Sequence, residues 1–162
     1  MSDGIGKWKL VLLATFVLLC DQLSKFTVLH FLSRGDCYQV LSFFNIVRVE
    51  NRGITFGIFN GASTSALVLI LLSLAIVLLL VMWVRREMIY QLPASGIIAG
   101  AVGNALDRIF HGAVIDFLDF HIGAYHWPAF NVADSVIVVA ATAMVCFSRC
   151  LEKRKGSQEL RS

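Results

Sequence analysis

The longest uninterrupted apolar segment constrains the fold more than any other feature of this sequence. Ala66 to Val84 holds 19 residues without a charge, and Arg85 and Arg86 follow it directly. An α-helix of about 20 mostly apolar residues crosses the hydrocarbon core of a bilayer. Three other segments are nearly as apolar, although each contains some polar residues. We predict four membrane spans, at about residues 8–32, 64–84, 88–108 and 131–149.

The composition is also that of an integral membrane protein. Hydrophobic residues make up 57% of the 162 residues and charged residues only 15%, with a mean hydropathy of +0.75, which is unlike a soluble domain. We therefore predict one domain over residues 1–162, a membrane all-α fold in which a four-helix transmembrane bundle carries a small extracytoplasmic β-element. The positive charges lie at segment ends rather than on one face between aromatic residues, so no nucleic-acid partner is expected.

The distribution of Lys and Arg predicts the orientation. With four spans, nine of the fourteen Lys and Arg residues lie on one side of the membrane, which the positive-inside rule identifies as the cytoplasm. These residues are Lys7, Lys9, Arg85, Arg86, Arg149, Lys153, Arg154, Lys155 and Arg161. Both termini are then expected in the cytoplasm, with 151–162 as a solvated tail. The first span is expected to be retained, because Leu19 precedes Cys20 where a lipoprotein-type cleavage site needs a small residue.

Two outer segments are rich in aromatic residues. Residues 33–60 alternate aromatic, β-branched and polar side chains and contain "ENRG" (50–53) as a possible turn, so a short β-element resting on the membrane surface is predicted. The segment 109–130 is expected on the same side. In strand geometry Asp116 and Asp119 would face opposite ways, because their separation is odd. Asp119 is then expected to face water.

Ionisable residues at membrane depth are costly and indicate function by default. Asp21 and Lys25 are four residues apart in the first span, a spacing that allows an ion pair on one helix face. Asn104, Asp107 and Arg108 form a polar stripe on the third span, and glycines 96, 100 and 103 precede it. Small residues at this spacing allow close helix packing. An Asp107–Arg108 ion pair is expected to orient the helix end, with Arg108 able to reach a substrate carbonyl or a lipid phosphate.

A second carboxylate at the outer face accompanies Asp116. Asn131 and Asp134 lie at the start of the last span, where Asn131 can cap the helix. Asp134, at the third helical position, would then point into the bundle. Two carboxylates in a low-dielectric cleft share a proton, so that one can deprotonate a water while the other polarises a carbonyl. This is the chemistry of an aspartic peptidase.

Three other interpretations are open from the residues. His111, His121 and His126 could serve a metallopeptidase, although no HExxH motif occurs and their spacing is not that of helical metal ligands. The intramembrane polar residues could form the relay of a small transporter. They could also be paired for structure alone. The four cysteines show neither disulfide nor zinc spacing. Aspartic peptidase chemistry uses no metal, and no cofactor is expected.

Five sequence blocks together resemble the lipoprotein signal peptidases, or signal peptidases II, of bacteria. The blocks are "DQLSK" (21–25), "NRGITFG" (51–57), "GNALDR" (103–108), "VIDF" (114–117) and "FNVADS" (130–135). The resemblance implies a four-span inner-membrane aspartic peptidase that removes the signal peptide of a prolipoprotein before its diacylglyceryl-modified cysteine. Its partners would be these lipidated prolipoproteins and membrane lipids.

The resemblance also implies roles for individual residues. Asp116 and Asp134 would be the catalytic pair. Substrate-binding or supporting positions are matched by Asn51, Gly53, Asn104, Asp107, Arg108, Asn131, Asp21 and Lys25. Residues 33–57 would form a β-cradle at the membrane surface. The chain departs from the family where Ile54 and Thr55 replace two alanines, which would narrow or reshape the substrate cleft.

Overall fold

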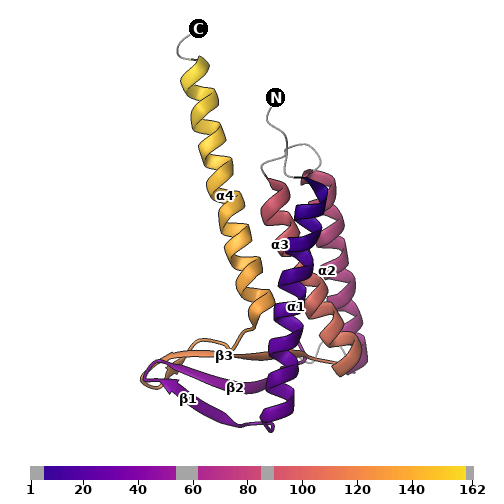
Figure 1. Cartoon of the computed structure of the whole chain (residues 1–162), viewed down its shortest axis with the longest axis vertical. Helices are drawn as coiled ribbons and strands as arrows, with labels where there is room; N and C mark the ends of the chain where they lie inside the picture. The colour runs from indigo at the N-terminus through magenta and orange to yellow at the C-terminus, as the bar shows by residue number, and fades with distance from the viewer. Residues whose placement is uncertain (1–5, 54–61, 85–89, 160–162) are drawn as a thin grey trace.

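The computed structural model describes residues 6–53, 62–84 and 90–159. It contains a bundle of helices and one small antiparallel sheet at one end of that bundle (Figure 1). Ile54 and Thr55 lie outside the described residues. The predicted combination of a helical bundle with a small β-element is confirmed.

Each predicted apolar segment contains a helix. The helices are α1 (Lys7–Phe31), α2 (Ala62–Val84), α3 (Gln91–His111) and α4 (Val132–Glu159). α4 continues through most of the segment expected as a tail, since residues 151–159 are mainly good helix formers. By length and composition, two stretches within the described ranges could cross a membrane, Lys7–Phe31 and Val132–Arg149, and α2 holds a shorter apolar stretch at Leu67–Leu80.

Helix α3 lies at the centre of the bundle and contacts the other three helices, while α1 also contacts α4. Its glycines make this packing possible. A Cβ at Gly100 would lie 2.8 Å from the carbonyl oxygen of Ala133 in α4, and a Cβ at Gly103 would lie 2.5 Å from Asp21 Oδ2 in α1. The predicted close helix approach at the glycines is therefore confirmed.

The sheet consists of neighbouring antiparallel strands in the order β1-β2-β3-β4. The strands are β1 (Cys37–Leu41), β2 (Phe44–Asn51), β3 (Val114–Ile122) and β4 (Tyr125–His126). The first hairpin turns at residues 42–43. The segment 50–53, predicted as a turn, begins as strand at Glu50 and Asn51 and bends at Gly53, where the Asn51 side chain accepts the backbone N–H. Glu50 and Asn51 pair with Ile115 and Val114 of β3. From the sequence, this strand was expected only to lie in an outer segment rich in aromatic residues.

A register shift between β2 and β3 decides which side chains meet. Asn45 lies opposite Asp119 and Asn51 lies opposite Val114, with the irregularity between Ile46 and Val49. Asn45 and Asn51 are an even number of residues apart and would share one face of a regular strand. The extra residue in β2 places them on opposite faces, so that Asn51 hydrogen bonds to Asp116 and Asn45 to Asp119.

Asp119 is buried rather than water-facing, with a relative exposure of 6%, so that expectation is wrong. Its Oδ2 accepts a hydrogen bond from Asn45 Nδ2 at 2.8 Å, and both of its oxygens lie 2.9 Å from His126 Nδ1. Burial raises the pKa of this carboxyl, but the hydrogen bonds from Asn45 and His126 outweigh it and hold the pKa below its ordinary value. Asp119 thus joins three strands.

Asp119→Ala should destabilise the protein by about 1–3 kcal/mol, because it leaves Asn45 and His126 without their shared acceptor. Denaturant or thermal unfolding in detergent would measure the loss. Arg34→Ala is a suitable control, since the Arg34–Glu50 pair is largely exposed at Arg34 and should contribute less than about 1 kcal/mol. Equal losses in the two variants would contradict a structural role for buried Asp119.

Candidate active site

The start of α4 is capped as predicted. The backbone N–H of Asp134 donates to Asn131 Oδ1 at 2.9 Å, and the N–H of Ser135 donates to the Asn131 carbonyl at 3.1 Å. Asn131 is completely buried. Because its oxygen is used by the cap, its amide nitrogen is directed at other acceptors.

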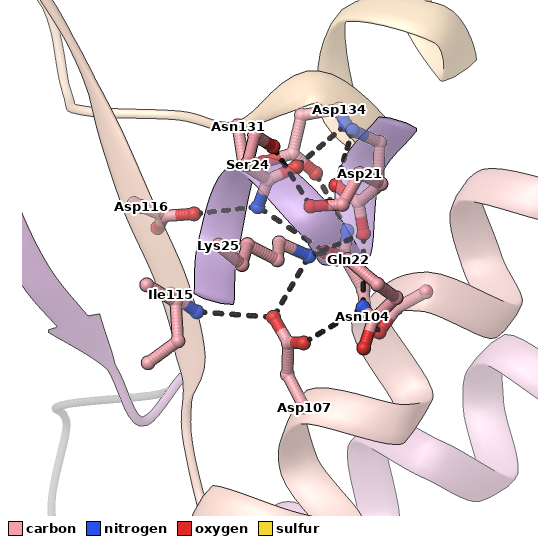
Figure 2. Close-up of polar contacts among 12 residues, drawn as sticks. Asp21, Gln22, Ser24, Lys25, Asn104, Asp107, Ile115, Asp116, Asn131 and Asp134 are labelled. Atoms are coloured by element: carbon pink, nitrogen blue, oxygen red, sulfur yellow. Dashed lines mark hydrogen bonds and ion pairs between the residues drawn. The ribbon is translucent and has the colours of Figure 1, made fainter. Parts of the chain in front are cut away.

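The two predicted catalytic carboxylates are joined through amides from different elements (Figure 2). Asp116 accepts hydrogen bonds from Asn131 Nδ2 at 2.7 Å and from Asn51 Nδ2 at 3.0 Å, one on each oxygen. Asp134 Oδ1 accepts from Asn104 Nδ2 at 2.8 Å, and Asn131 Nδ2 also lies 3.2 Å from Asn104 Oδ1. The sheet, α3 and α4 therefore bring Asp116 and Asp134 into one polar network.

The surroundings of Asp116 favour its protonated form. Burial raises the pKa of this carboxyl from 3.8 to about 6, with repulsion from Asp134 adding to the rise, while the hydrogen bonds from Asn51 and Asn131 and the charge of Lys25 oppose it. Asp116 lies on β3, and its relative exposure is 2%. A carboxyl with a raised pKa beside a second carboxylate can hold or release a proton near neutral pH.

The raised pKa predicts how Asp116 affects stability. The folded state binds this proton more tightly than the unfolded chain, so the stabilisation is fully present below about pH 4 and is lost as the pH rises through about 6. Asp116→Asn cannot titrate. Its Tm relative to the unmutated protein should therefore rise between these pH values, in thermal melts recorded in detergent. A Tm difference that is constant with pH would contradict the raised pKa.

Lys25 is the centre of a buried charged cluster. Its Nζ lies 2.8 Å from Asp21 Oδ2 and 2.8 Å from Asp107 Oδ2, and it donates to Asn104 Oδ1 at 3.0 Å. The Asp21–Lys25 pair was predicted and is confirmed. The expected Asp107–Arg108 pair is wrong, because Asp107 pairs with Lys25. Adjacent residues on a helix point in different directions, and Asp107 faces α1.

The cluster also fixes backbone from two other elements. Asp21 Oδ1 accepts the N–H of Ala133 in α4 at 2.9 Å, and Asp107 Oδ2 accepts the N–H of Ile115 in β3 at 3.1 Å. Gln22 Nε2 lies 3.1 Å from both Asp21 and Asp107. Gln22 is not among the site residues expected from the sequence. Its contact with Asp107 depends on how α1 packs against α3.

Arg108 and the Asn51–Gly53 turn border the two carboxylates. Arg108 Nη1 donates to the carbonyl of Asn104 at 3.2 Å, and its buried Nε has no hydrogen-bond partner among the described residues. Its charge interacts with Asp134 and Asp116. Asn51 Oδ1 accepts the N–H of Gly53 at 3.0 Å, and Gly53 has a φ of +84°, which favours glycine.

The three histidines considered as metal ligands are not gathered in one place. His121 and His126 stack with ring centroids 4.8 Å apart on β3 and β4, whereas His111 ends α3. Within the described ranges, no group of three or more His, Cys, Asp or Glu side chains is arranged to hold a metal ion. The residues that surround Asp116 and Asp134 are amides, a lysine and an arginine, which suit proton transfer and carbonyl binding.

Comparisons with known proteins identify the family of this chain. The family model for signal peptidase (SPase) II matches residues 13–149. A lipoprotein signal peptidase of Burkholderia vietnamiensis is 40% identical over 148 residues, which cover 89% of this chain and 88% of the relative. One from Burkholderia thailandensis is 39% identical over 137 residues, with 82% of each chain covered.

Two solved structures, both described as bacterial membrane enzymes determined by the in meso method, are similar in fold. The one at 2.3 Å resolution has a TM-score of 0.79 at 29% identity and covers 97% of this chain and 95% of its own. The one at 1.9 Å resolution has a TM-score of 0.78 at 30% identity, with 90% and 96% covered. By sequence and by fold, the chain belongs to the signal peptidase II family of aspartic-type peptidases.

Proposed function

We propose that this protein removes the signal peptide from prolipoproteins whose lipobox cysteine carries diacylglycerol, cutting directly before that cysteine. Asp116 and Asp134 are the catalytic residues. The observation that carries the proposal is the amide bridge through Asn131 and Asn104 that joins the two carboxylates. It gives both of them N–H donors and holds them in one site, as a shared water requires.

The reaction needs one ionised and one protonated carboxyl. The ionised one takes a proton from a water molecule, whose oxygen attacks the scissile carbonyl, while the protonated one donates a hydrogen bond to the carbonyl oxygen. The tetrahedral intermediate then collapses, the C–N bond breaks, and the cysteine amine leaves with a proton from the pair. No covalent intermediate and no cofactor are required.

Side chains next to the pair are suited to bind the substrate backbone. Arg108 offers a guanidinium whose charge interacts with Asp134 and Asp116, and a guanidinium can donate hydrogen bonds to a peptide carbonyl. Asn51 and Asn131 each donate an amide hydrogen bond to Asp116, and Gly53 donates its backbone N–H to Asn51. Supporting contacts from the bundle come from Asp21, Lys25, Asn104 and Asp107.

We also propose four membrane spans, cytoplasmic termini and an outer sheet in a bacterial inner membrane. The beginning of α1 and the end of α4 lie at one end of the bundle, and the sheet lies at the other (Figure 1). Asp116 on β3 and Asp134 in the first turn of α4 are near the sheet. This arrangement suits a substrate whose apolar signal helix ends at the outer membrane surface.

The direct test uses purified protein and a diacylglyceryl-modified prolipoprotein, with cleavage followed by gel shift and the new N-terminus identified by mass spectrometry. Cleavage before the cysteine should persist in a strong chelator, and the unlipidated substrate should be cleaved poorly. Loss of activity in the chelator would favour the histidine-based metallopeptidase. Ion or solute flux in proteoliposomes, surviving Asp116→Asn, would favour a transporter.

A further inference from the structure

The orientation of the Asn104 side-chain amide determines whether its NH₂ group or its oxygen faces Asp134. Asn104 Nδ2 donates to Asp134 Oδ1 at 2.8 Å, while Asn104 Oδ1 faces Lys25 Nζ at 3.0 Å. A rotation of the amide by 180° would bring two oxygens together at Asp134 and two donors together at Lys25. An ammonium group has donors only, so Lys25 permits one orientation of the Asn104 amide.

Resting on the proposed function, we propose that Lys25 is a positioning residue, whose ammonium orients the Asn104 amide and so keeps an N–H donor on Asp134. Lys25 is 2% exposed, and its side chain extends from α1 to Asp107 and Asn104 of α3 (Figure 2). It therefore acts through Asn104 and does not touch the substrate. Lys25 also neutralises the charges of Asp21 and Asp107, but that second role does not involve Asn104.

Other groups around Asn104 do not replace Lys25. Asn131 Nδ2 also approaches Asn104 Oδ1, but at the longer distance of 3.2 Å, and the same nitrogen donates to Asp116 at 2.7 Å. Arg108 donates to the backbone carbonyl of Asn104, which does not depend on the side-chain amide. The charged groups facing this amide are thus Lys25 and Asp134, with Asp21 and Asp107 behind Lys25.

The single variant Lys25→Met cannot test this role, because it changes the charge of the cluster. Asp21, Asp107 and Lys25 together carry one net negative charge, and removing the ammonium would leave two buried carboxylates uncompensated. Two double variants keep the original net charge, Lys25→Met with Asp21→Asn and Lys25→Met with Asp107→Asn. The asparagine oxygen can still accept the backbone N–H of Ala133 or Ile115.

We expect at least one double variant to recover most of the Tm that Lys25→Met loses. Its kcat on the lipidated prolipoprotein should nevertheless stay about 10²- to 10³-fold below that of the unmutated protein, since one oriented donor at a reaction centre has an effect on this order. KM should be unchanged, because Lys25 does not touch the substrate. In an Asn104→Ala background, the same double variant should lower kcat no further.

Val17→Ala is the matched control for a general loss of stability, because Val17 is buried on α1, the helix that carries Lys25. Its kcat should not change. A double variant that regained both Tm and kcat would overturn the positioning role, as would failure of both double variants to regain Tm. The proposed function is tested independently. It fails if the unmutated protein leaves the lipidated substrate uncut, whatever the Lys25 variants do.

Discussion

Asp116→Asn and Asp134→Asn should each lower kcat at least about 10³-fold, because a pair that acts as one unit loses its function when either member is removed. Asparagine keeps the shape of the side chain but can neither take a proton from water nor share one. Initial rates on lipidated prolipoprotein, at equal concentrations of monodisperse protein, would test this. Activity above a tenth of the original in either variant would remove that aspartate from the catalytic pair.

The two substitutions should differ in their effect on stability. Asp134 uses one oxygen for Asn104, and an asparagine can present its oxygen there, so Asp134→Asn should change stability by less than about 0.5 kcal/mol. Asp116 accepts an amide donor on each oxygen. In Asp116→Asn, the new NH₂ group must therefore face one of these donors, at a cost of about 1–3 kcal/mol, which the removal of a buried titrating group partly offsets. Folded but inactive variants would exclude a purely structural role for the pair.

Gly103→Ala should have the second largest effect, because the new Cβ would lie 2.5 Å from Asp21 Oδ2. Asp21 is fully buried and is held by Lys25 and by the N–H of Ala133, so it cannot move without breaking the cluster. We expect a loss of about 2–4 kcal/mol in unfolding free energy, of the size seen when a buried ion pair is disrupted, together with lower cleavage activity.

Gly96→Ala is the matched control on the same helix. The nearest neighbour of its Cβ would be the side chain of Val136 at 3.1 Å, and that side chain can adjust. Both substitutions gain about 1 kcal/mol in helix propensity over glycine, so the difference between them isolates the contact with Asp21. Thermal unfolding in one detergent would measure both. If the Gly103→Ala protein were as stable as the Gly96→Ala protein, the contact between the new Cβ and Asp21 would not destabilise the fold.

Features that depend on local spacing could be predicted from the order of residues along the chain. The apolar segments predicted the helices, the i, i+4 spacing predicted the Asp21–Lys25 pair, and Asn131 before the last helix predicted its cap. Such contacts follow from the 3.6-residue period of a helix, which the order of residues along the chain displays directly. The motif blocks also identified the family.

The contacts between side chains of different helices and strands could not be predicted in this way. Asp107 turned out to pair with Lys25, Asn45 with Asp119, and Asn51 with Asp116. The last two depend on a strand register with one extra residue in β2, and the first depends on the rotation of α3 against α1. Contacts between residues more than sixty positions apart are set by packing and register, which the local sequence pattern does not encode.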